Sequence, residues 1–279
     1  GRSYAKCNGR PDAQDSLVGE DASVTQVTTD WTVLTFTAVA FGIFFYGISK
    51  TSMPVAGVIA GPLLAAALTP TVASGFALPL LIVGDLVALT RYRSYANWPL
   101  IFRLLPGVLV GILITAFLFT VMPIWLLTRM LGLLILISVI LEIWRRSNKE
   151  KKKTERVNSG RRRALAGFFG VLAGMTSMAA NAGGTAMSLY LAHMRVTTLT
   201  FMGTSAWFFF GVNLIKVPIV IQLDLLSWET LKVNLLFLPA LVLGTVVGIY
   251  VFKRLDEKKF YAIALGLSSL AAVWLLIHG

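Results

Sequence analysis

The segment Gly174-Met-Thr-Ser-Met-Ala-Ala-Asn-Ala-Gly-Gly-Thr185 places small polar residues and three glycines inside an apolar chain. The whole chain of 279 residues is 56% hydrophobic and only 14% charged, with a mean hydropathy of +0.76. A soluble domain of this size does not tolerate so much apolar surface, so the composition indicates an integral membrane protein. The segment must therefore be explained at membrane depth, where irregular backbone is tolerated only against protein or a water-filled cavity.

Apolar segments follow one another along the chain. The ten predicted segments are 31–48, 54–68, 72–90, 100–121, 125–144, 163–178, 183–194, 198–221, 232–252 and 260–277. A membrane-spanning helix needs about 20 apolar residues. Segments 54–68 and 183–194 would be only about 22 Å and 18 Å long as helices, so neither crosses a membrane alone. The sequence predicts an all-α, polytopic membrane protein with broken or re-entrant helices.

The two halves of the chain resemble each other at an offset of roughly 127 to 134 residues, a collinear match found by pairing residues of like type. The paired residues are Gly47 with Gly174, Gly57 with Gly184, Asp85 with Asn213, Trp98 with Trp228, Pro106 with Pro239, Gly111 with Gly244, and Gly132 with Gly266. Five segments per half is an odd number, so the second repeat must be inverted relative to the first. Inverted repeats with short, interrupted segments in corresponding places are typical of transporters whose substrate site lies where the interruptions meet.

The basic residues define a predicted topology. The stretch 145–163 carries ten basic residues against two acidic ones, and the positive-inside rule places it in the cytoplasm. Counting spans from there puts both termini on the outer side. We expect a polar tail at 1–30, a first repeat at 31–144, a cytoplasmic linker at 145–162 and a second repeat at 163–278. Because basic residues gather at the ends of apolar segments, the net charge of +12 reflects topology and no nucleic-acid partner is predicted.

Charged residues within the apolar segments suggest a site. Lys216 follows Asn213 by three residues on the same helical face, and a lysine at the membrane centre costs on the order of 3 kcal/mol unless it meets a cavity, a partner or an anion. The alternative for Lys216 is snorkelling to the outer interface. Asp85 is a candidate for proton coupling or, alternatively, for a structural ion pair with Lys50.

Two lysines and two helix breaks favour an anion as substrate, because helix N-termini present free N–H groups and a partial positive charge. Hydroxyl and amide side chains near the second break can add hydrogen bonds. The predicted substrate-binding residues are Lys216, Asn213, Asn181, Ser177, Gly183, Gly184, Thr204 and Lys50. The bland alternative for the glycines is close packing of membrane helices.

Several motifs of the second half carry a family resemblance. They are Gly170-Val-Leu-Ala-Gly174, Asn181-Ala-Gly-Gly184, Tyr190-Leu-Ala192, Phe201-Met-Gly-Thr-Ser205 and Asn213-Leu-Ile-Lys-Val-Pro218. Together they resemble the sulfite exporter TauE/SafE family, over about residues 34 to 278. The resemblance implies a multi-helix transporter that moves sulfite or small organosulfur anions. Periodicity and charge placement alone support only a small-anion transporter. As its mechanism we expect alternating access around a central site.

Two other classes of function compete with a transporter. An enzyme would need a nucleophile with its base or a metal cage, but the histidines are limited to His193 and His278 and no hydrolase or metalloprotease motif occurs. We therefore predict no enzymatic activity, cofactor or metal. An anion channel or a scaffold subunit without flux stays as the alternative. The predicted partners are a small anion and the lipid bilayer, and formation of a homo-oligomer stays open.

Overall fold

The structure is a computed structural model that describes residues 31–52, 57–147, 159–194, 196–250, 266, 269–270 and 272–277. The predicted polar tail at 1–30, the middle of the basic linker and part of the tenth apolar segment lie outside the described residues.

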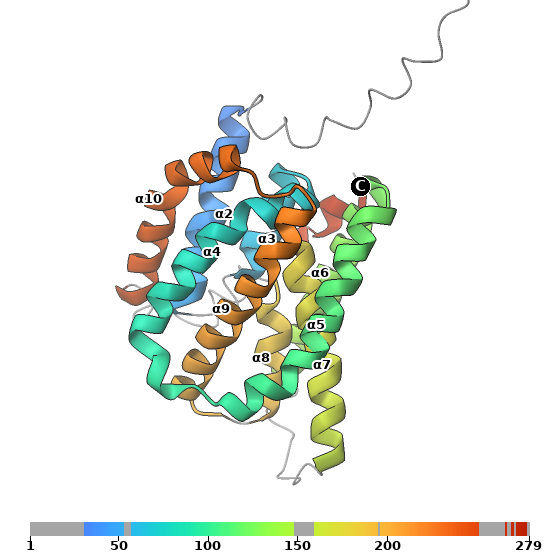
Figure 1. Cartoon of the computed structure of the whole chain (residues 1–279), viewed down its shortest axis with the longest axis vertical. Helices are drawn as coiled ribbons and strands as arrows, with labels where there is room; N and C mark the ends of the chain where they lie inside the picture. The colour runs from blue at the N-terminus through green and yellow to red at the C-terminus, as the bar shows by residue number, and fades with distance from the viewer. Residues whose placement is uncertain are drawn as a thin grey trace, which may run out of the picture.

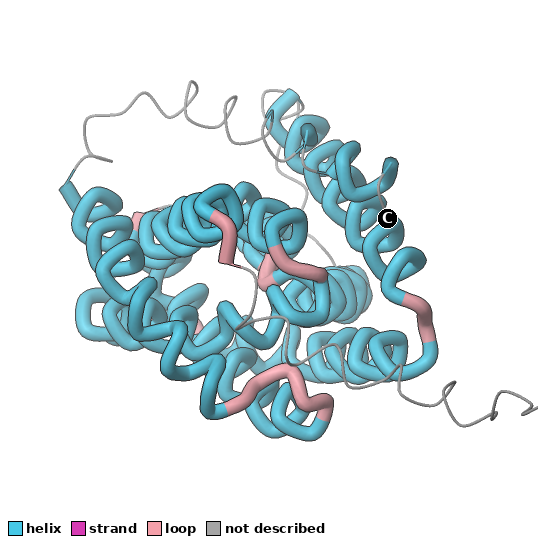
Figure 2. Tube along the Cα trace, turned by 90° about the horizontal axis from the view of Figure 1, so that it is seen from above, coloured by secondary structure: helices cyan, strands magenta, loops and turns pink. Residues whose placement is uncertain are grey.

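Every described secondary-structure element is helical (Figures 1 and 2). The helices are α2 (Val33–Thr51), α3 (Gly57–Ala67), α4 (Pro70–Tyr92), the short 3₁₀ turn η2 (Arg93–Tyr95), α5 (Trp98–Val121), α6 (Ile124–Ser147), α7 (Ser159–Ala180), α8 (Gly184–His193), α9 (Thr198–Gln222) and α10 (Trp228–Tyr250). Residues 272–277 are also helical. The all-α prediction is confirmed, and the described helix ends fall within about four residues of the predicted ones, the usual error of boundary prediction.

Six of the described helices are long and apolar enough to cross a membrane. The chain is therefore an integral, multi-pass membrane protein. In contrast, α3 has 11 residues and α8 has 10, both well below the length that crosses a bilayer. Each short helix lies between two long helices in the chain. α3 follows α2 and precedes α4, and α8 follows α7 and precedes α9.

Local chemistry explains where several helices start. The Thr32 side chain accepts a hydrogen bond from the Thr35 N–H at the start of α2, and Thr197 does the same for Thr200 at the start of α9. Asn97 caps α5 by accepting from the Leu100 N–H. These side chains bond N–H groups that the helix itself leaves without acceptors.

Glycines set the closest helix contacts. Gly47 of α2 lies against Gly244 of α10, and Gly111 of α5 lies against Gly174 of α7. A Cβ at any of these four positions would collide with the backbone of the facing helix. The repeat alignment pairs Gly47 with Gly174 and Gly111 with Gly244, so in that alignment the two contacts correspond to each other.

A second pair of contacts repeats in the same way. Gly75 near the start of α4 abuts the backbone of Leu225, which follows α9. Gly203 near the start of α9 abuts Tyr95 and Ala96, which follow α4. The start of α4 thus packs against the segment that follows α9, and the start of α9 packs against the segment that follows α4. Figure 1 shows that α4 starts at the top of the view and α9 starts at the bottom, so the two helices run in opposite directions.

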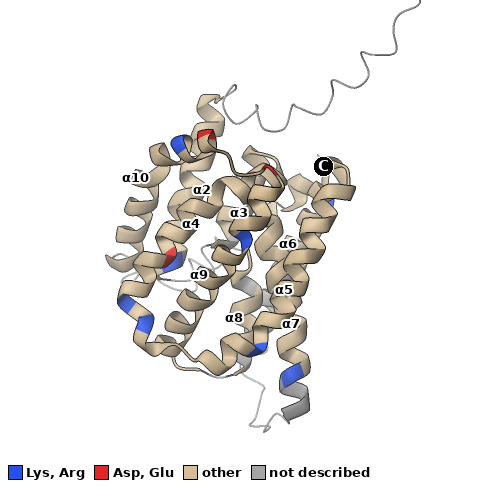
Figure 3. Cartoon of the chain, viewed as in Figure 1, with Lys and Arg blue, Asp and Glu red and all other residues tan. Residues whose placement is uncertain are grey.

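Charged residues of the described helices lie mostly toward the ends of the bundle, with a few at positions in its interior (Figure 3). Asp85 and Lys216 are completely buried, and the Lys50 side chain is 10% exposed. Burying charge in an apolar core requires partners, because an unpaired ion loses its hydration. These three residues therefore mark the interior site.

Candidate functional site

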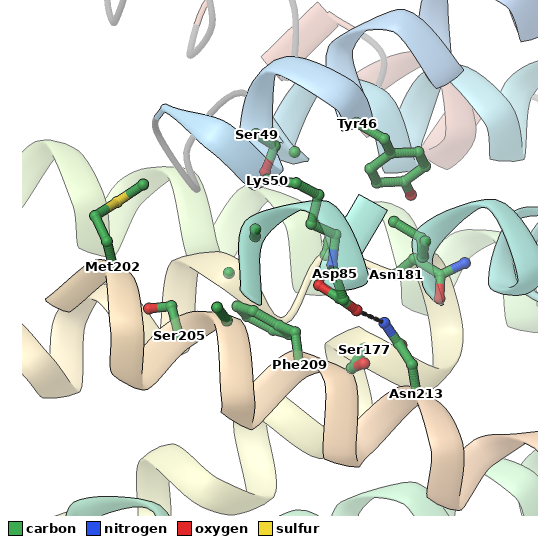
Figure 4. A pocket seen from close by; sticks show the side chains of 16 residues that line it. Tyr46, Ser49, Lys50, Asp85, Ser177, Asn181, Met202, Ser205, Phe209 and Asn213 are labelled. Carbon is green, nitrogen blue, oxygen red and sulfur yellow. Dashed lines mark hydrogen bonds and ion pairs between the residues drawn. The ribbon is translucent and has the colours of Figure 1, made fainter. Parts of the chain in front are cut away.

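A cavity of about 40 Å³ lies among α2, α4, the junction of α7 with α8, and α9 (Figure 4). A water needs roughly 10–15 Å³ on this measure, so the cavity has room for about three atoms of that size. Its polar lining consists of Tyr46, Ser49, Lys50, Asp85, Ser177, Asn181, Ser205 and Asn213. Its other lining residues are Gly57, Leu81, Ala88, Ala182, Gly184, Met202, Ala206 and Phe209.

Asp85 of α4 binds two side chains at once. The Lys50 Nζ lies 2.5 Å from Asp85 Oδ1, and the Asn213 Nδ2 donates to Asp85 Oδ2 over 2.7 Å. The Lys50 stem reaches the carboxylate by crossing Gly84, where a Cβ would lie 3.0 Å from the lysine Cγ. The Lys50 ammonium also lies 5.0 Å from the ring centroid of Phe209, a cation–π distance. The structural ion pair considered for Asp85 and Lys50 is therefore present.

Lys216 of α9 has a different environment. Its Nζ donates to the Ser177 carbonyl oxygen over 2.7 Å and to Asn181 Oδ1 over 2.5 Å. Ser177 lies in the last turn of α7, where the negative end of the helix dipole favours a cation. Because the ammonium is buried and bonded to these oxygens, Lys216 does not snorkel to an interface.

Asn181 holds the second helix break in place. Its φ of 52° lies in the left-handed region, which asparagine tolerates better than most residues. Its side chain accepts from Lys216 and donates to the Ser74 carbonyl oxygen of α4 over 3.2 Å. The residue therefore ends α7, orients Lys216 and ties the break to the first half of the chain.

Both short helices begin at the cavity. Gly57, the first residue of α3, and Gly184, the first residue of α8, line it. The first N–H groups of a helix have no acceptor within that helix and carry a partial positive charge. Gly183 precedes α8 and accepts from the Met187 N–H, and a Cβ there would lie 2.9 Å from the Ala173 carbonyl oxygen. The first residues of two helices thus line one small cavity.

The structure places the predicted site residues at three depths. Those that line the cavity are Lys50, Asp85, Ser177, Asn181, Gly184 and Asn213. Lys216 lies behind Asn181, and Gly183 packs between Ala173 and Ser177. Thr204 does not line the cavity, because its Oγ accepts from the Asn97 backbone N–H over 3.0 Å and so joins α9 to the start of α5.

Sequence reasoning missed several lining residues, including Tyr46, Ser49 and Ser205. Ser205 and Phe209 precede Asn213 by eight and four residues, so all three share one face of α9. Following the helical face from Asn213 back by four and eight residues would have predicted Phe209 and Ser205 as lining residues. No such spacing in the sequence points to Ser49, which lies beside Lys50 near the end of α2.

The end of the bundle where α2 and α4 begin is densely packed. Trp31, Phe36, Phe76 and Phe237 form a contiguous aromatic cluster, with ring centroids 4.9 Å apart for Phe36 and Phe237 and 5.5 Å apart for Trp31 and Phe237. The Tyr46 hydroxyl donates to the Ala180 carbonyl oxygen over 3.0 Å, between this cluster and the cavity. The cavity lies toward the other ends of these two helices. It is lined by the second halves of α2 and α4, residues 202–213 of α9, the start of α3, and the junction of α7 with α8.

Comparison with known proteins gives one match. The model of the sulfite exporter TauE/SafE family matches residues 35–275. No curated protein and no solved structure matched the chain. Because the family match covers most of the chain, and the fold is an all-helical, multi-pass bundle, this chain belongs to the sulfite exporter TauE/SafE family, which implies a membrane transporter of sulfur anions.

Proposed function

We propose that this protein carries sulfite or a related small organosulfur anion across a membrane by alternating access around the cavity. One observation supports this most strongly: two short helices begin at a membrane-buried cavity that Lys50 also lines. Free N–H groups at helix N-termini and an ammonium group are complementary to the oxygens of a sulfite or sulfonate group. The proposed activity is transport, with no chemical conversion of the anion.

The proposed binding roles follow from position. Lys50 supplies charge on the cavity wall, and the α3 and α8 N-termini supply backbone N–H groups near Gly57 and Gly184. The side chains of Ser177, Asn181 and Asn213 supply hydrogen bonds. Lys216 contributes positive charge from behind Asn181 and orients that amide. The role proposed for Gly183 is to let the chain before α8 pack closely against α7. The role proposed for Thr204 is structural, because its hydroxyl joins α9 to the start of α5.

We also propose that the two halves are inverted repeats that move against each other. The exchanged contacts of Gly47 with Gly244 and of Gly111 with Gly174 support this arrangement. Asp85 and Asn213, which are counterparts in the two halves, hydrogen-bond to each other on the central helices α4 and α9. A site on such a pseudo-two-fold axis can be exposed from either side in turn.

The proposed orientation places the basic linker in the cytoplasm and both termini outside. Arg91, at the end of α4 nearest the cavity, and Arg93, the first residue of η2, then face the cytoplasm. In this orientation the aromatic cluster closes the outer end, so the conformation is closed outward. We propose that α3 and α8 act as re-entrant helices whose movement opens the two ends alternately.

Asp85 is the proposed group for proton coupling. Its carboxylate lines the cavity and contacts Lys50, so a proton on Asp85 would weaken the hold on the lysine that faces the anion. An imposed proton gradient should change sulfite uptake in the wild type. Uptake by Asp85→Asn, if measurable, should not respond to the gradient.

The experiment that tests the proposed function is sulfite uptake into proteoliposomes containing purified protein. Wild type is compared with Lys50→Gln and with Lys232→Gln, a matched control whose lysine is exposed and pairs with Glu229 over 2.7 Å. We expect saturable uptake in the wild type and control, and at least about tenfold less in Lys50→Gln, since a lost charged hydrogen bond costs about 1.5–3 kcal/mol. Non-saturable current would indicate a channel, and folded protein without flux a scaffold.

A further inference from the structure

The charges around the cavity do not cancel. Lys50 and Asp85 are the charged residues among the described residues that line it, and they form an ion pair. Lys216 adds a second positive charge behind Asn181, where its two acceptors are the uncharged oxygens of Ser177 and Asn181. Two lysines against one carboxylate leave a formal side-chain charge of +1, since 2 − 1 = 1.

The helix ends near the cavity contribute charge of both signs. The N-termini of α3 and α8 each carry about half a positive charge, and the C-termini of α2 and α7 each carry about half a negative charge. Lys50 lies in the last turn of α2, and the Lys216 ammonium binds the last turn of α7. The four helix ends therefore offset one another to first order, and the side chains decide the net charge.

We propose that the cavity selects anions by charge state, binding singly charged anions and rejecting doubly charged ones. A monoanion neutralises the +1 site within the membrane, whereas a dianion leaves a buried charge of −1 beside the Asp85 carboxylate. Buried net charge is costly in either sign. Asp85 is thus a specificity-determining residue that acts by repulsion.

Ser205 supports the presence of a polar ligand in the same space. It lines the cavity, is 6% exposed, and its hydroxyl has no hydrogen-bond partner among the described residues. A buried hydroxyl without a partner is unfavourable, so a bound group that accepts its hydrogen bond would stabilise the site. Phe209, Met202 and Ala206 surround it with apolar surface that fits a short alkyl substituent of a sulfonate better than a further charged oxygen.

This inference rests on the proposed anion site, and its test separates the two. Binding of methanesulfonate, a monoanion, and sulfate, a dianion, is measured by calorimetric titration of the purified protein, because neither changes charge near neutral pH. Sulfite uptake into proteoliposomes is measured in parallel. Wild type should bind methanesulfonate on the order of 100-fold more tightly than sulfate, because the second charge of sulfate loses its hydration on burial and the site has no further positive charge to compensate it.

Variants that change the charge count sharpen the test. Asp85→Asn raises the site to +2 and should shift the preference toward sulfate by at least about tenfold. The double variant Lys50→Gln/Asp85→Asn returns the site to +1 and should restore the preference for methanesulfonate. The exposed pair supplies the controls Glu229→Gln and Lys232→Gln, which should bind both anions as the wild type does.

Each outcome bears on the proposal. Equal binding of the two anions by wild type, or an unchanged preference in folded Asp85→Asn, overturns it even if sulfite is transported. If Asp85→Asn does not fold, the wild-type ratio and the double variant decide. Methanesulfonate preference without sulfite flux supports the charge selection but overturns the transporter. Binding of neither anion overturns both.

Discussion

The two buried lysines lie at the same site and have different hydrogen-bond partners. Lys50 pairs with a carboxylate and lines the cavity, whereas Lys216 binds two uncharged oxygens at the end of α7 and lies behind the lining. The Lys50 ammonium is therefore held where a ligand in the cavity can reach it. The Lys216 ammonium instead stabilises the break between α7 and α8. The two residues should therefore respond differently to substitution, although both looked alike as lysines in apolar segments.

The largest effect on stability is expected for Lys50→Met. It leaves Asp85 as an unpaired charge in the core, which costs about 3–5 kcal/mol. Denaturant unfolding of the purified protein measures the loss. The double variant Lys50→Met/Asp85→Leu removes both charges and should recover most of the stability while uptake stays low. Wild-type stability in the single variant would contradict the ion pair.

Lys216→Met should cost less, about 1–3 kcal/mol, because it removes the partner of an uncharged acceptor rather than the partner of a buried charge. Asn181 Oδ1 loses the Lys216 ammonium, whereas the Ser177 carbonyl oxygen keeps its hydrogen bond from the Asn181 backbone N–H over 3.0 Å. The same unfolding assay makes the comparison with Lys50→Met direct. If Lys216→Met were the more damaging of the two single variants, the distinction between the two lysines would be wrong.

The sequence predicts the features that depend on neighbouring residues in the chain. The apolar segments, the two short helices and the paired glycines follow from composition and spacing, and the structure has the helices close to where they were expected. The repeat alignment paired Asp85 with Asn213 without predicting a contact, and in the structure the two side chains hydrogen-bond to each other. The motifs also led to the correct family.

The partners of the lysines were beyond the sequence. Lys216 and Asn213 share a helical face, but only the packing of α9 against the end of α7 decides that Lys216 meets Ser177 and Asn181. Thr204 lies one residue from Ser205, and that step around the helix turns its hydroxyl toward Asn97 and away from the cavity. Such choices depend on tertiary contacts between segments far apart in the chain.

Substitution of Asn181 offers a smaller and more local test of the break between α7 and α8, where Lys216 binds. Asn181→Ala and Asn181→Gly both remove the amide contacts, but only alanine meets strain at a φ of 52°. Alanine should therefore be less stable than glycine by about 1–2 kcal/mol. Equal stability of the two variants in the unfolding assay would mean that the backbone at residue 181 is not left-handed.

The smallest effect is expected at the exposed pair. Glu229 and Lys232 lie three residues apart on α10, and their side chains are 61% and 56% exposed. Glu229→Gln should change stability by no more than about 1 kcal/mol, since water screens such pairs. Sulfite uptake should match the wild type. If Glu229→Gln lost as much stability as Lys50→Met, the unfolding assay would not be reporting the contribution of the buried ion pair.

The central claim is that the cavity beside Lys50 binds the transported anion. A cryo-electron-microscopy structure of the purified protein in saturating sulfite tests it most directly. The account predicts density for one small anion within hydrogen-bond distance of the Lys50 Nζ, near the first residues of α3 and α8. Density for sulfite elsewhere in the bundle, with this cavity empty, would contradict it.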